Sequence, residues 1–367
     1  MKKLLLVSKE WSPKNKTGLG FCSTLHESIL KDVGFEVATV SSSNIDKNFN
    51  LKLNGFFHFV FNPFFFLKKS ESIIKDYKPD FIVVESLQTV ISEIFIYLAK
   101  KNKIKSVIVS HGISIFPYKN KVKYFIRSML WIIYLPLLYF LIKACDVFFS
   151  LDPDSNNSRH LDSQLFKKKN KLIIKYNNTS RFENFKKDLV FAKSKRKTIL
   201  CIGYINHIKN QEDLIKLADK IYDLDIDIKI IYNNFDKIYF NKLKKIIYNK
   251  NIKNIYFIHE DETNILNEII NCWLLVNVSI TEVSPLSLIE GNSLSKTFLS
   301  YNVGSLSNFK GAIVHYSLKQ IIFNIRSLYN NNYFLKKLEM QALQDYRDNY
   351  SKKNIKNSFK KIQNISL

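Results

Sequence analysis

The sequence predicts an α/β protein of two Rossmann-like domains, each a doubly wound parallel sheet, that face a shared cleft. Short apolar runs alternate with helix-like stretches along most of the 367 residues, which is typical of parallel sheets. A polar stretch at 177–197, rich in Asn, Lys and Arg, separates this alternation into two halves. Glycines follow the ends of several apolar runs, at the sheet edge where open α/β sheets bind ligands.

The apolar runs give the expected strands in chain order. In the first half they cover residues 3–8, 35–41, 80–85, 105–110 and 145–150, and in the second half 198–202, 227–232, 254–258, 273–279 and 296–300. Helices are expected between them, for example at 21–33 and 88–101. We therefore expect domains at residues 1–178 and 179–345, followed by a C-terminal helix at 346–367 that packs back on the first domain.

Glycine placement supports a ligand site shared by both domains. The chain has only nine glycines, so we expect each to stand where the backbone conformation or a close contact requires glycine. Five of them follow expected strands in the two halves: Gly18, Gly20, Gly112, Gly203 and Gly304. Turn geometry alone explains any one of them, whereas the repeated placement indicates a cleft between the domains.

The chain is basic, with a formal net charge of +24, and the excess lies mainly in the first half. Residues 1–200 hold 34 lysines and arginines against 16 aspartates and glutamates, whereas residues 201–367 hold 22 against 16. This imbalance predicts an anionic partner for the first domain, such as a membrane surface or a phosphorylated acceptor. The sequence has no zinc-ligand spacing and no aromatic RNA-binding strand, so nucleic acid is not expected as a partner.

Cysteine usage and the N-terminus bear on the compartment. The four cysteines, Cys22, Cys145, Cys201 and Cys272, lie far apart, and three sit in or beside apolar runs. This is typical of reduced core thiols in a cytosolic protein. The apolar run at 4–7 is short and soon followed by charge, which indicates a first strand and not a signal peptide. We expect a cytoplasmic protein that is peripheral at the inner face of the cell membrane.

One segment, MLWIIYLPLLYFLI at 129–142, is apolar on all sides. The uncharged stretch around it is too short for a comfortable membrane span, which needs about 20 residues. A buried core helix is one interpretation of this segment. The other is a helix partly inserted at the bilayer interface, with anionic headgroups on nearby basic side chains, namely Lys119, Lys121, Lys123 and Arg127.

Three short motifs follow expected strands and contain residue types that bind ligands. KNKTGLGF at 14–21 follows the first strand, where glycines let the backbone approach a ligand and a helix start receives an anion. His111 in Ser-His-Gly stands at the end of the strand at 105–110. Lys209 follows Gly203 at the start of a helix, well placed to meet a diphosphate. A packed or capping histidine and a solvated lysine are the alternative interpretations.

The fourth motif, TEVSPLSLIEGNSL at 281–294, follows another expected strand. Ser284 is expected as the N-cap of a helix, with Pro285 at the first helical position. Glu282 and Glu290 flank this helix start, whose free amides and dipole suit a phosphate. Carboxylates on either side of a phosphate match the layout of a sugar nucleotide. A capped helix with two solvated glutamates is the alternative.

In order and spacing, these motifs resemble the retaining nucleotide-sugar glycosyltransferases of family 4, which have the GT-B fold. The resemblance runs nearly end to end: TGLG and GFEV near the N-terminus, SHG at 110–112, GYINHIKN at 203–210, the glutamate pair, and NVG at 302–304. It implies an enzyme that moves a hexosyl group, with retention of configuration, from a nucleoside-diphosphate sugar to a glycan or lipid-linked acceptor of surface-polysaccharide biosynthesis, such as lipopolysaccharide or capsule. It implies no metal and no other cofactor. A catalytically silent subunit that binds sugar nucleotide or lipid, and a nucleotide-sugar epimerase, remain alternatives on the same fold.

The resemblance also implies roles for individual residues. Glu290 would bind the ribose of the donor, and Glu282 the hydroxyls of the donor sugar. The amides near Leu286 and Ser287 would receive phosphate oxygens. Lys209 would neutralise the leaving diphosphate, which is the charge that develops in the transition state.

The first domain would supply the remaining site residues. By the same resemblance, His111 would lie near the transferred sugar, and the loop with Gly18 and Gly20 would border the donor phosphate and the acceptor. The chain departs from the family at Tyr204, where an arginine is usual. Either the motif lysine suffices, or another basic residue such as Lys296 supplies the missing charge, or the activity is altered.

Asp152-Pro153-Asp154 is a competing motif directly after an expected strand. Aspartate pairs of this kind hold a divalent metal in the other major glycosyltransferase fold. A turn built from Asp and Pro is the better interpretation here, because that fold does not account for the second alternating domain. We therefore expect no metal site.

Overall fold

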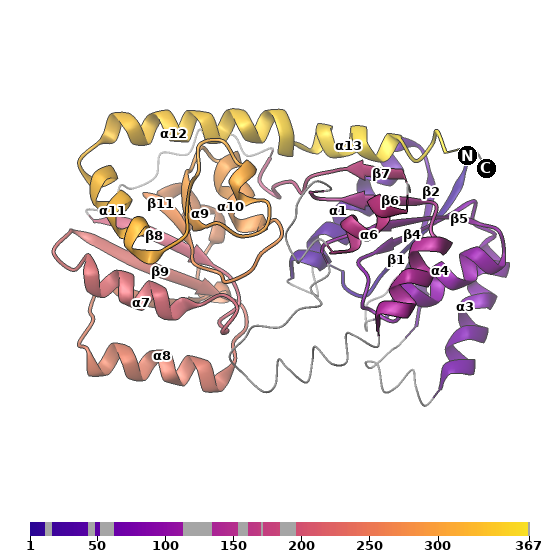
Figure 1. Ribbon diagram of the computed structural model, residues 1–367, viewed down its shortest axis with the longest axis horizontal. Helices are drawn as coiled ribbons and strands as arrows, with labels where there is room; N and C mark the ends of the chain where they lie inside the picture. The colour runs from indigo at the N-terminus through magenta and orange to yellow at the C-terminus, as the bar shows by residue number, and fades with distance from the viewer. Residues whose placement is uncertain are drawn as a thin grey trace. The chain divides into compact units, whose positions relative to one another are not determined.

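The computed structural model describes residues 1–11, 17–42, 48–51, 62–112, 134–152, 161–169, 172–183 and 196–365. The chain forms two compact units (Figure 1). Unit 1 combines Met1–Asn177 with Lys353–Leu367, and unit 2 is the continuous stretch Asn178–Lys352. The chain therefore enters unit 2 once, leaves it once, and then adds a second segment to unit 1.

Unit 1 is built on a seven-stranded parallel sheet with the order β3-β2-β1-β4-β5-β6-β7. Its strands are β1 (Lys3–Ser8), β2 (Glu36–Ser41), β3 (Phe49–Asn50), β4 (Phe81–Glu85), β5 (Lys105–Val109), β6 (Val147–Ser150) and β7 (Leu172–Lys175). Its helices are α1 (Gly18–Val33), α3 (Pro63–Tyr77), α4 (Ile91–Lys101), α6 (Leu161–Lys168) and α13 (Lys352–Lys360), and residues 134–144 are helical as well. The strand order reverses between β1 and β4, which is where such sheets bind ligands.

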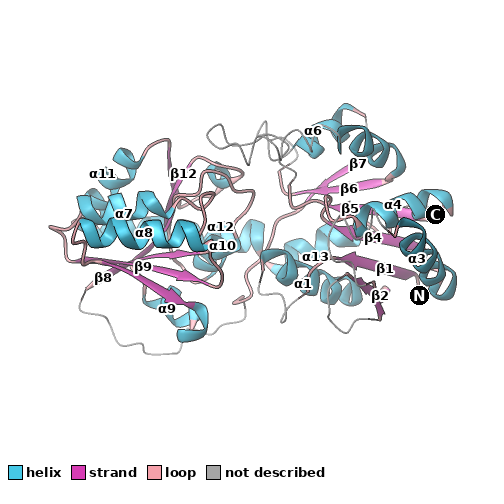
Figure 2. Cartoon of the chain, turned by 90° about the horizontal axis from the view of Figure 1, so that it is seen from below, coloured by secondary structure: helices cyan, strands magenta, loops and turns pink. Residues whose placement is uncertain are grey.

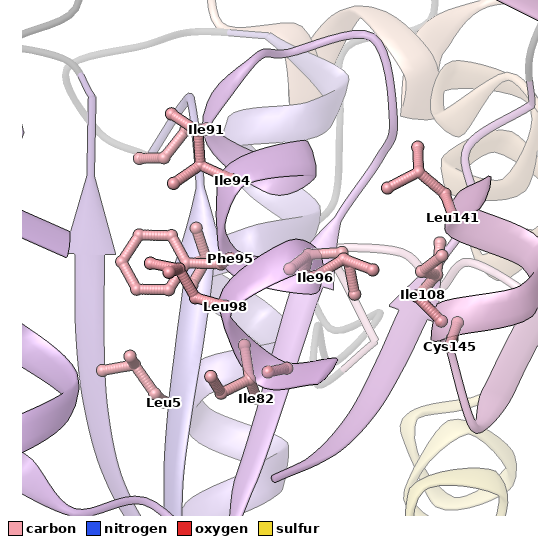
Figure 3. Packing of buried hydrophobic residues seen from close by; sticks show 14 of the residues in the cluster. Leu5, Ile82, Ile91, Ile94, Phe95, Ile96, Leu98, Ile108, Leu141 and Cys145 are labelled. Carbon is pink, nitrogen blue, oxygen red and sulfur yellow. The ribbon is translucent and has the colours of Figure 1, made fainter. Parts of the chain in front are cut away.

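Helices cover both faces of this sheet. Successive strand residues point to opposite sides, so neighbouring side chains pack against different helices. On one face, Leu5 of β1 packs in a cluster with Phe95 of α4 (Figure 3). Phe148 of β6 belongs to the same cluster. Its neighbour Phe149 instead packs on Phe359 of α13, with 5.0 Å between ring centroids. Helix α13 therefore belongs to the core of unit 1.

Unit 2 has a six-stranded parallel sheet with the order β10-β9-β8-β11-β12-β13. Its strands are β8 (Lys197–Ile202), β9 (Ile226–Tyr232), β10 (Ile255–His259), β11 (Leu274–Asn277), β12 (Phe298–Tyr301) and β13 (Ile313–His315). Its helices are α7 (Gln211–Lys220), α8 (Lys237–Asn249), α9 (Ile265–Asn271), α10 (Leu286–Ser293), α11 (Leu318–Tyr329) and α12 (Asn332–Asp345), with short 3₁₀ turns at Glu260–Glu262 and Leu306–Asn308 and a π-helical turn at Tyr346–Tyr350. Here the strand order reverses between β8 and β11.

Two hydrophobic clusters sandwich the unit 2 sheet, and Figure 2 shows α7 and α8 on one face with α9 on the other. Ile199 of β8 packs in the cluster that contains Leu214 of α7 and Tyr239 of α8. The next residue, Leu200, packs in the cluster that contains Ile269 of α9. Burial on both faces explains why the strands read as continuous apolar runs.

All ten expected strands are present, and their ends agree with the structure within two residues. The expected α/β architecture of two parallel sheets is thus confirmed. Three further strands, β3, β7 and β13, were not expected. All three are edge strands. The first and last are only two and three residues long, and β7 has three apolar residues but buries only Ile174, so none of them is a long buried strand.

The apolar segment at 129–142 lies only partly within the described residues, which exclude 113–133 and with them its basic flank, Lys119, Lys121, Lys123 and Arg127. In the helical part, Leu138 and Leu141 are buried, whereas Leu137 and Phe140 are 41% and 40% exposed. The helix therefore packs one face on the core and leaves apolar side chains on the other. Within the described ranges, no helix is both long and apolar enough to cross a membrane.

Candidate functional site

The residues expected in a shared site divide between the two units, and each group follows the carboxyl ends of its own sheet's strands. Unit 1 holds His111, Gly18 and Gly20. Unit 2 holds Lys209, Glu282, Leu286, Ser287 and Glu290.

Lys209 and Glu282 form an ion pair in unit 2, between Nζ of the lysine and Oε1 of the glutamate. The lysine is held by the turn after β8, because Oδ1 of Asn206 accepts hydrogen bonds from the amides of Ile208 (2.9 Å) and Lys209 (3.0 Å). The amide of Ile280 donates to the carbonyl of Ile208 at 2.8 Å and so joins this turn to the loop after β11. The two oppositely charged side chains are therefore brought together by backbone contacts between their loops.

Gly304 and Ser305 support the segment that carries Glu282. A Cβ at Gly304, which has φ +60°, would collide with the carbonyl oxygens of Glu282 and Val283. Ser305 donates to the carbonyl of Val283 from both its amide (3.0 Å) and its hydroxyl (2.7 Å). Glycine is therefore required at this position after β12, since only a residue without a side chain lets the backbone come so close to the segment with Glu282.

Glu290 lies on α10, is only 3% exposed, and is paired with Arg181. Nε of Arg181 lies 2.8 Å from Oε1 and Nη2 lies 3.4 Å from Oε2, so the guanidinium engages both carboxylate oxygens. Burial raises the pKa of Glu290 to about 7, although Arg181 opposes this shift. Gly291 lets α10 lie close to β11, because a Cβ there would collide with Leu275. The second glutamate of the pair is therefore a core carboxylate with one charged partner, and not a solvated one.

The start of α10 differs slightly from the expectation. Pro285 is the N-cap and the helix begins at Leu286, whereas Ser284 was expected to cap it with Pro285 as its first residue. The reason is the backbone of Pro285, whose ψ of 121° is extended. In the part of the chain that the structure describes, the amides of Leu286 and Ser287 have no hydrogen-bond partner, as is usual for the first turn of a helix. These amides and the helix dipole favour an anion.

In unit 1, His111 pairs with a carboxylate that the sequence interpretation missed. Nε2 of His111 lies 2.9 Å from Oε2 of Glu85, and Nδ1 of His26 lies 2.8 Å from Oε1 of the same residue. Burial alone would raise the pKa of Glu85, but the two histidines outweigh it and lower the pKa to about 2. A signal did exist, because Glu85 ends an otherwise apolar strand beside the strand that leads to His111.

Gly18 and Gly20 lie in the first turn of α1, whereas a loop ahead of the helix was expected. Thr17 is the N-cap, and its hydroxyl accepts a hydrogen bond from the amide of Gly20 at 3.0 Å. That amide is therefore used within the helix start. Residues 14–16 of the expected glycine motif lie outside the described residues.

Two basic residues bear on position 204, where the chain has Tyr204 and the resemblance leads to the expectation of an arginine. Lys296 does not supply its charge, because Nζ donates to the carbonyl of Cys272 at 2.6 Å, ahead of β11 and away from the strand ends that carry the site. Arg181 does reach the site residues, through Glu290. Sequence reasoning missed it because 109 positions separate the two partners and no local pattern connects them.

The competing Asp152-Pro153-Asp154 motif lies largely outside the described residues, which include only Asp152 of the three. Among the described ranges, no group of three or more His, Cys, Asp or Glu side chains could hold a metal ion.

Comparison with known proteins gives one family match. The family Glycosyl transferases group 1 matches residues 182–327, which lie in unit 2 and include Lys209, Glu282 and Glu290. Curated protein sequences give no significant match.

Solved structures match over nearly the whole chain. Sucrose-phosphate synthase from Thermosynechococcus elongatus has a TM-score of 0.73 and 11% identity, covering 99% of this chain and 98% of that one. HepE of Anabaena, solved with UDP-glucose, has a TM-score of 0.70 and 11% identity over 99% and 100%. WaaG, a glycosyltransferase involved in lipopolysaccharide biosynthesis, has a TM-score of 0.70 and 12% identity over 99% and 100%. At such identities the likeness shows the fold, which is the two-domain GT-B fold.

Proposed function

We propose that this chain, whose residues 182–327 match the glycosyl transferases group 1, is a glycosyltransferase that moves a sugar from a nucleoside-diphosphate sugar to a glycan or lipid-linked acceptor. The observation that carries this proposal is the placement of the family match, which covers most of the unit that holds the paired glutamates and Lys209. The GT-B fold supports it. The relative solved with UDP-glucose supports a nucleotide-sugar donor.

In this proposal the donor binds at the strand ends of unit 2. The free amides of Leu286 and Ser287 bind phosphate oxygens at the positive end of α10. Glu290 accepts hydrogen bonds from the ribose hydroxyls. Lys209 neutralises the diphosphate as it leaves, and Glu282 contacts the sugar hydroxyls. Because Lys209 and Glu282 now pair with each other, the donor must exchange that ion pair for contacts of its own.

We further propose that transfer retains the configuration of the donor sugar, as in family 4, and needs no metal. Positive charge for the leaving diphosphate then comes from Lys209 and α10. Arg181 is the further candidate for this charge, because it already contacts Glu290 and its side chain is 40% exposed. Undiminished turnover in EDTA is the expected result, and loss of turnover restored by a divalent metal would contradict it.

A membrane-facing role for unit 1 is supported by a surface that we call the aromatic face, formed by Tyr97, Leu135, Leu137, Tyr139 and Phe140, all 38–44% exposed. The rings of Tyr97 and Phe140 lie 6.3 Å apart and join α4 to helix 134–144. Two lysine ammonium groups, of Lys143 and Lys169, lie 4.9 and 4.8 Å from the Tyr139 ring. Apolar side chains bordered by lysines suit an interface with anionic lipid, where a lipid-linked acceptor is presented.

A panel of nucleotide sugars, with released nucleoside diphosphate as the readout, tests the activity. We expect release with at least one donor, and a loss of about 100-fold or more in Lys209→Ala, by analogy with other preorganised charges at a leaving group. Lys229→Ala is the matched control, because Lys229 forms a similarly half-buried ion pair with Glu268 in the same unit. Donor binding without release would favour the silent subunit. Tyr204, in place of the arginine that is usual in the family, is the feature of the sequence that supports this alternative. Conversion of the donor without an acceptor would favour the epimerase.

Flotation with liposomes tests the membrane proposal separately. We expect binding to anionic but not neutral vesicles, weakened by salt, and further weakened by the double substitution Leu137→Ser and Phe140→Ser. Phe323→Ser, at a 72% exposed position of unit 2, is the matched control. A protein that stays in solution with anionic vesicles at low salt would contradict this assignment.

A further inference from the structure

Glu85 is the last residue of β4, beside the switch point of the unit 1 sheet, and it is completely buried. A buried carboxylate is unfavourable unless it is paired and hydrogen-bonded. Each of its oxygens contacts one imidazole, that of His26 from α1 or that of His111 after β5. Three elements of the sheet edge therefore meet at one carboxylate.

The proton positions in this cluster follow from the charge of Glu85. With a pKa lowered to about 2, the carboxylate is ionised at neutral pH and can only accept hydrogen bonds. Both imidazoles must then donate, His26 from Nδ1 and His111 from Nε2. In a neutral His111 this arrangement leaves Nδ1 without a proton, as a hydrogen-bond acceptor.

His26 is the enclosed partner in this cluster. Its side chain has no exposed surface, and its Nε2 is buried with no hydrogen-bond partner among the described residues. Its ring packs on Phe359 of α13, with 4.7 Å between centroids. His26 therefore holds one oxygen of Glu85 from inside the core and leaves the other oxygen to His111.

The backbone around His111 is fixed on both sides. The hydroxyl of Tyr176 donates to the carbonyl of Ser110 at 2.8 Å. The hydroxyl of Ser110 donates to Asp162 and accepts from the amide of Gly112 at 2.9 Å. The imidazole of His111, with a 17% exposed side chain, is thus the part of this cluster that can reach a ligand.

We propose that Glu85 is a positioning residue that holds His111 in the Nε2–H tautomer, so that Nδ1 accepts a hydrogen bond from a sugar hydroxyl. Such a nitrogen binds a hydroxyl donor and disfavours a phosphate, which offers only acceptors when ionised. The assignment of the hydroxyl to the donor sugar rests on the proposed function. The tautomer does not, since it follows from contacts within unit 1.

Long-range ¹H–¹⁵N NMR of the histidines in the unliganded protein at pH 8 tests the tautomer directly. His111 is expected to show a protonated Nε2 and an unprotonated Nδ1, with the signals assigned by His111→Asn. In Glu85→Gln we expect a mixture of tautomers, because the introduced amide can donate as well as accept. A protonated Nδ1 in the natural protein would overturn the proposal, and this measurement decides it even if Glu85→Gln fails to fold.

Kinetics with the preferred donor supply the second test. Glu85→Gln is expected to lower kcat by about 10- to 100-fold, by analogy with the loss of outer-shell partners of metal-bound histidines, with little change in the donor KM. The matched control is Glu93→Gln, a second buried carboxylate of unit 1, which contacts the amide of Gln88 and the hydroxyl of Tyr134. Its kcat is expected to stay within about twofold of the natural protein.

The outcomes separate this inference from the function. An active transferase whose kcat is unchanged by Glu85→Gln would overturn the positioning role and leave the activity intact. The expected tautomers without turnover of any donor would support the positioning and contradict the proposed function.

Discussion

Glu85 in unit 1 and Glu290 in unit 2 are both buried carboxylates near the strand ends of their sheets, yet their pKa values move in opposite directions. Burial raises the pKa in both. Glu85 has two imidazole partners whose side chains are 0% and 17% exposed, and its pKa falls to about 2. Glu290 has Arg181, which is 40% exposed, and its pKa rises to about 7. Two partners outweigh the effect of burial at Glu85, whereas the single arginine does not outweigh it at Glu290.

The two glutamates are consequently suited to different tasks. Glu85 keeps its charge at any physiological pH, which suits a fixed acceptor that orients another side chain. Glu290 titrates near neutrality, so hydroxyl groups that donate to it can shift its protonation when they bind. The first is a structural charge and the second a responsive one.

Removing the charge of Glu85 should give the largest effect. In Glu85→Leu, His26 and His111 lose their common partner, and breaking a buried pair in this way destabilises by about 3–5 kcal/mol. Hydrogen exchange of the β4 and β5 amides measures the change within unit 1. Glu71→Leu, which removes the partly exposed partner of Lys101, is expected to leave this exchange unchanged. Equal protection in Glu85→Leu and the natural protein would show that the pairing contributes nothing.

The pH dependence of unit 2 should show the next largest effect. Between pH 4.5 and about 7 the folded unit binds more protons at Glu290 than the unfolded chain, so its stability is complete below pH 4.5 and falls as pH rises through 7. The shift corresponds to about 3 kcal/mol. In Glu290→Gln this fall should disappear, as measured by thermal unfolding across that range.

Glu85 should act in the opposite direction. Its lowered pKa contributes stability that is present above pH 4.5 and is lost as pH falls toward 2. If the two units instead lose stability over the same pH range, the contrast between the two carboxylates is wrong.

Replacing the arginine should give a smaller effect. Arg181→Met removes the charge that opposes the burial shift, so the pKa of Glu290 should rise above about 7, while unit 2 loses about 1 kcal/mol because the pair is partly solvated. A ¹³C NMR titration of the Glu290 carboxyl measures this shift. Arg196→Met is the control, since Arg196 is 42% exposed and pairs with Asp225 and Asp227. The control should leave the Glu290 titration in place.

Glu93 offers the smallest expected effect. Burial raises its pKa, despite hydrogen bonds from the Gln88 amide (2.5 Å) and the Tyr134 hydroxyl (2.7 Å). A neutral amide keeps the accepting oxygen, so Glu93→Gln should change the stability of unit 1 by less than about 1 kcal/mol. A loss as large as that of Glu85→Leu would mean that the charge of Glu93 contributes to its contacts.

The fold was predictable because its strands are buried on both faces. The run at 80–85 matches β4 within one residue, as does the run at 198–202 for β8. Edge strands such as β3 escaped because two half-buried residues leave no apolar run. The start of α10 was misplaced by one residue, since the backbone of Pro285 is extended, which the sequence does not show.

The site was predictable only in the residues that share a local motif. Lys209 and Glu282 follow neighbouring strands, so their pairing agrees with the parallel order of β8 and β11. Arg181 and His26 act through partners 109 and 59 positions away, and their own neighbours in sequence carry no ligand-binding pattern. Such pairings follow from tertiary contacts, which a single sequence does not reveal.

The division of unit 1 into two chain segments has a consequence for synthesis. A ribosome releases Met1–Asn177 first, but the Phe359 ring that packs on His26 and Phe149 arrives only after the whole of unit 2 has been made. Domains usually mature in the order of translation. Here unit 2 can reach its native state while unit 1 still lacks the helix that covers part of its core, so we expect unit 2 to mature first.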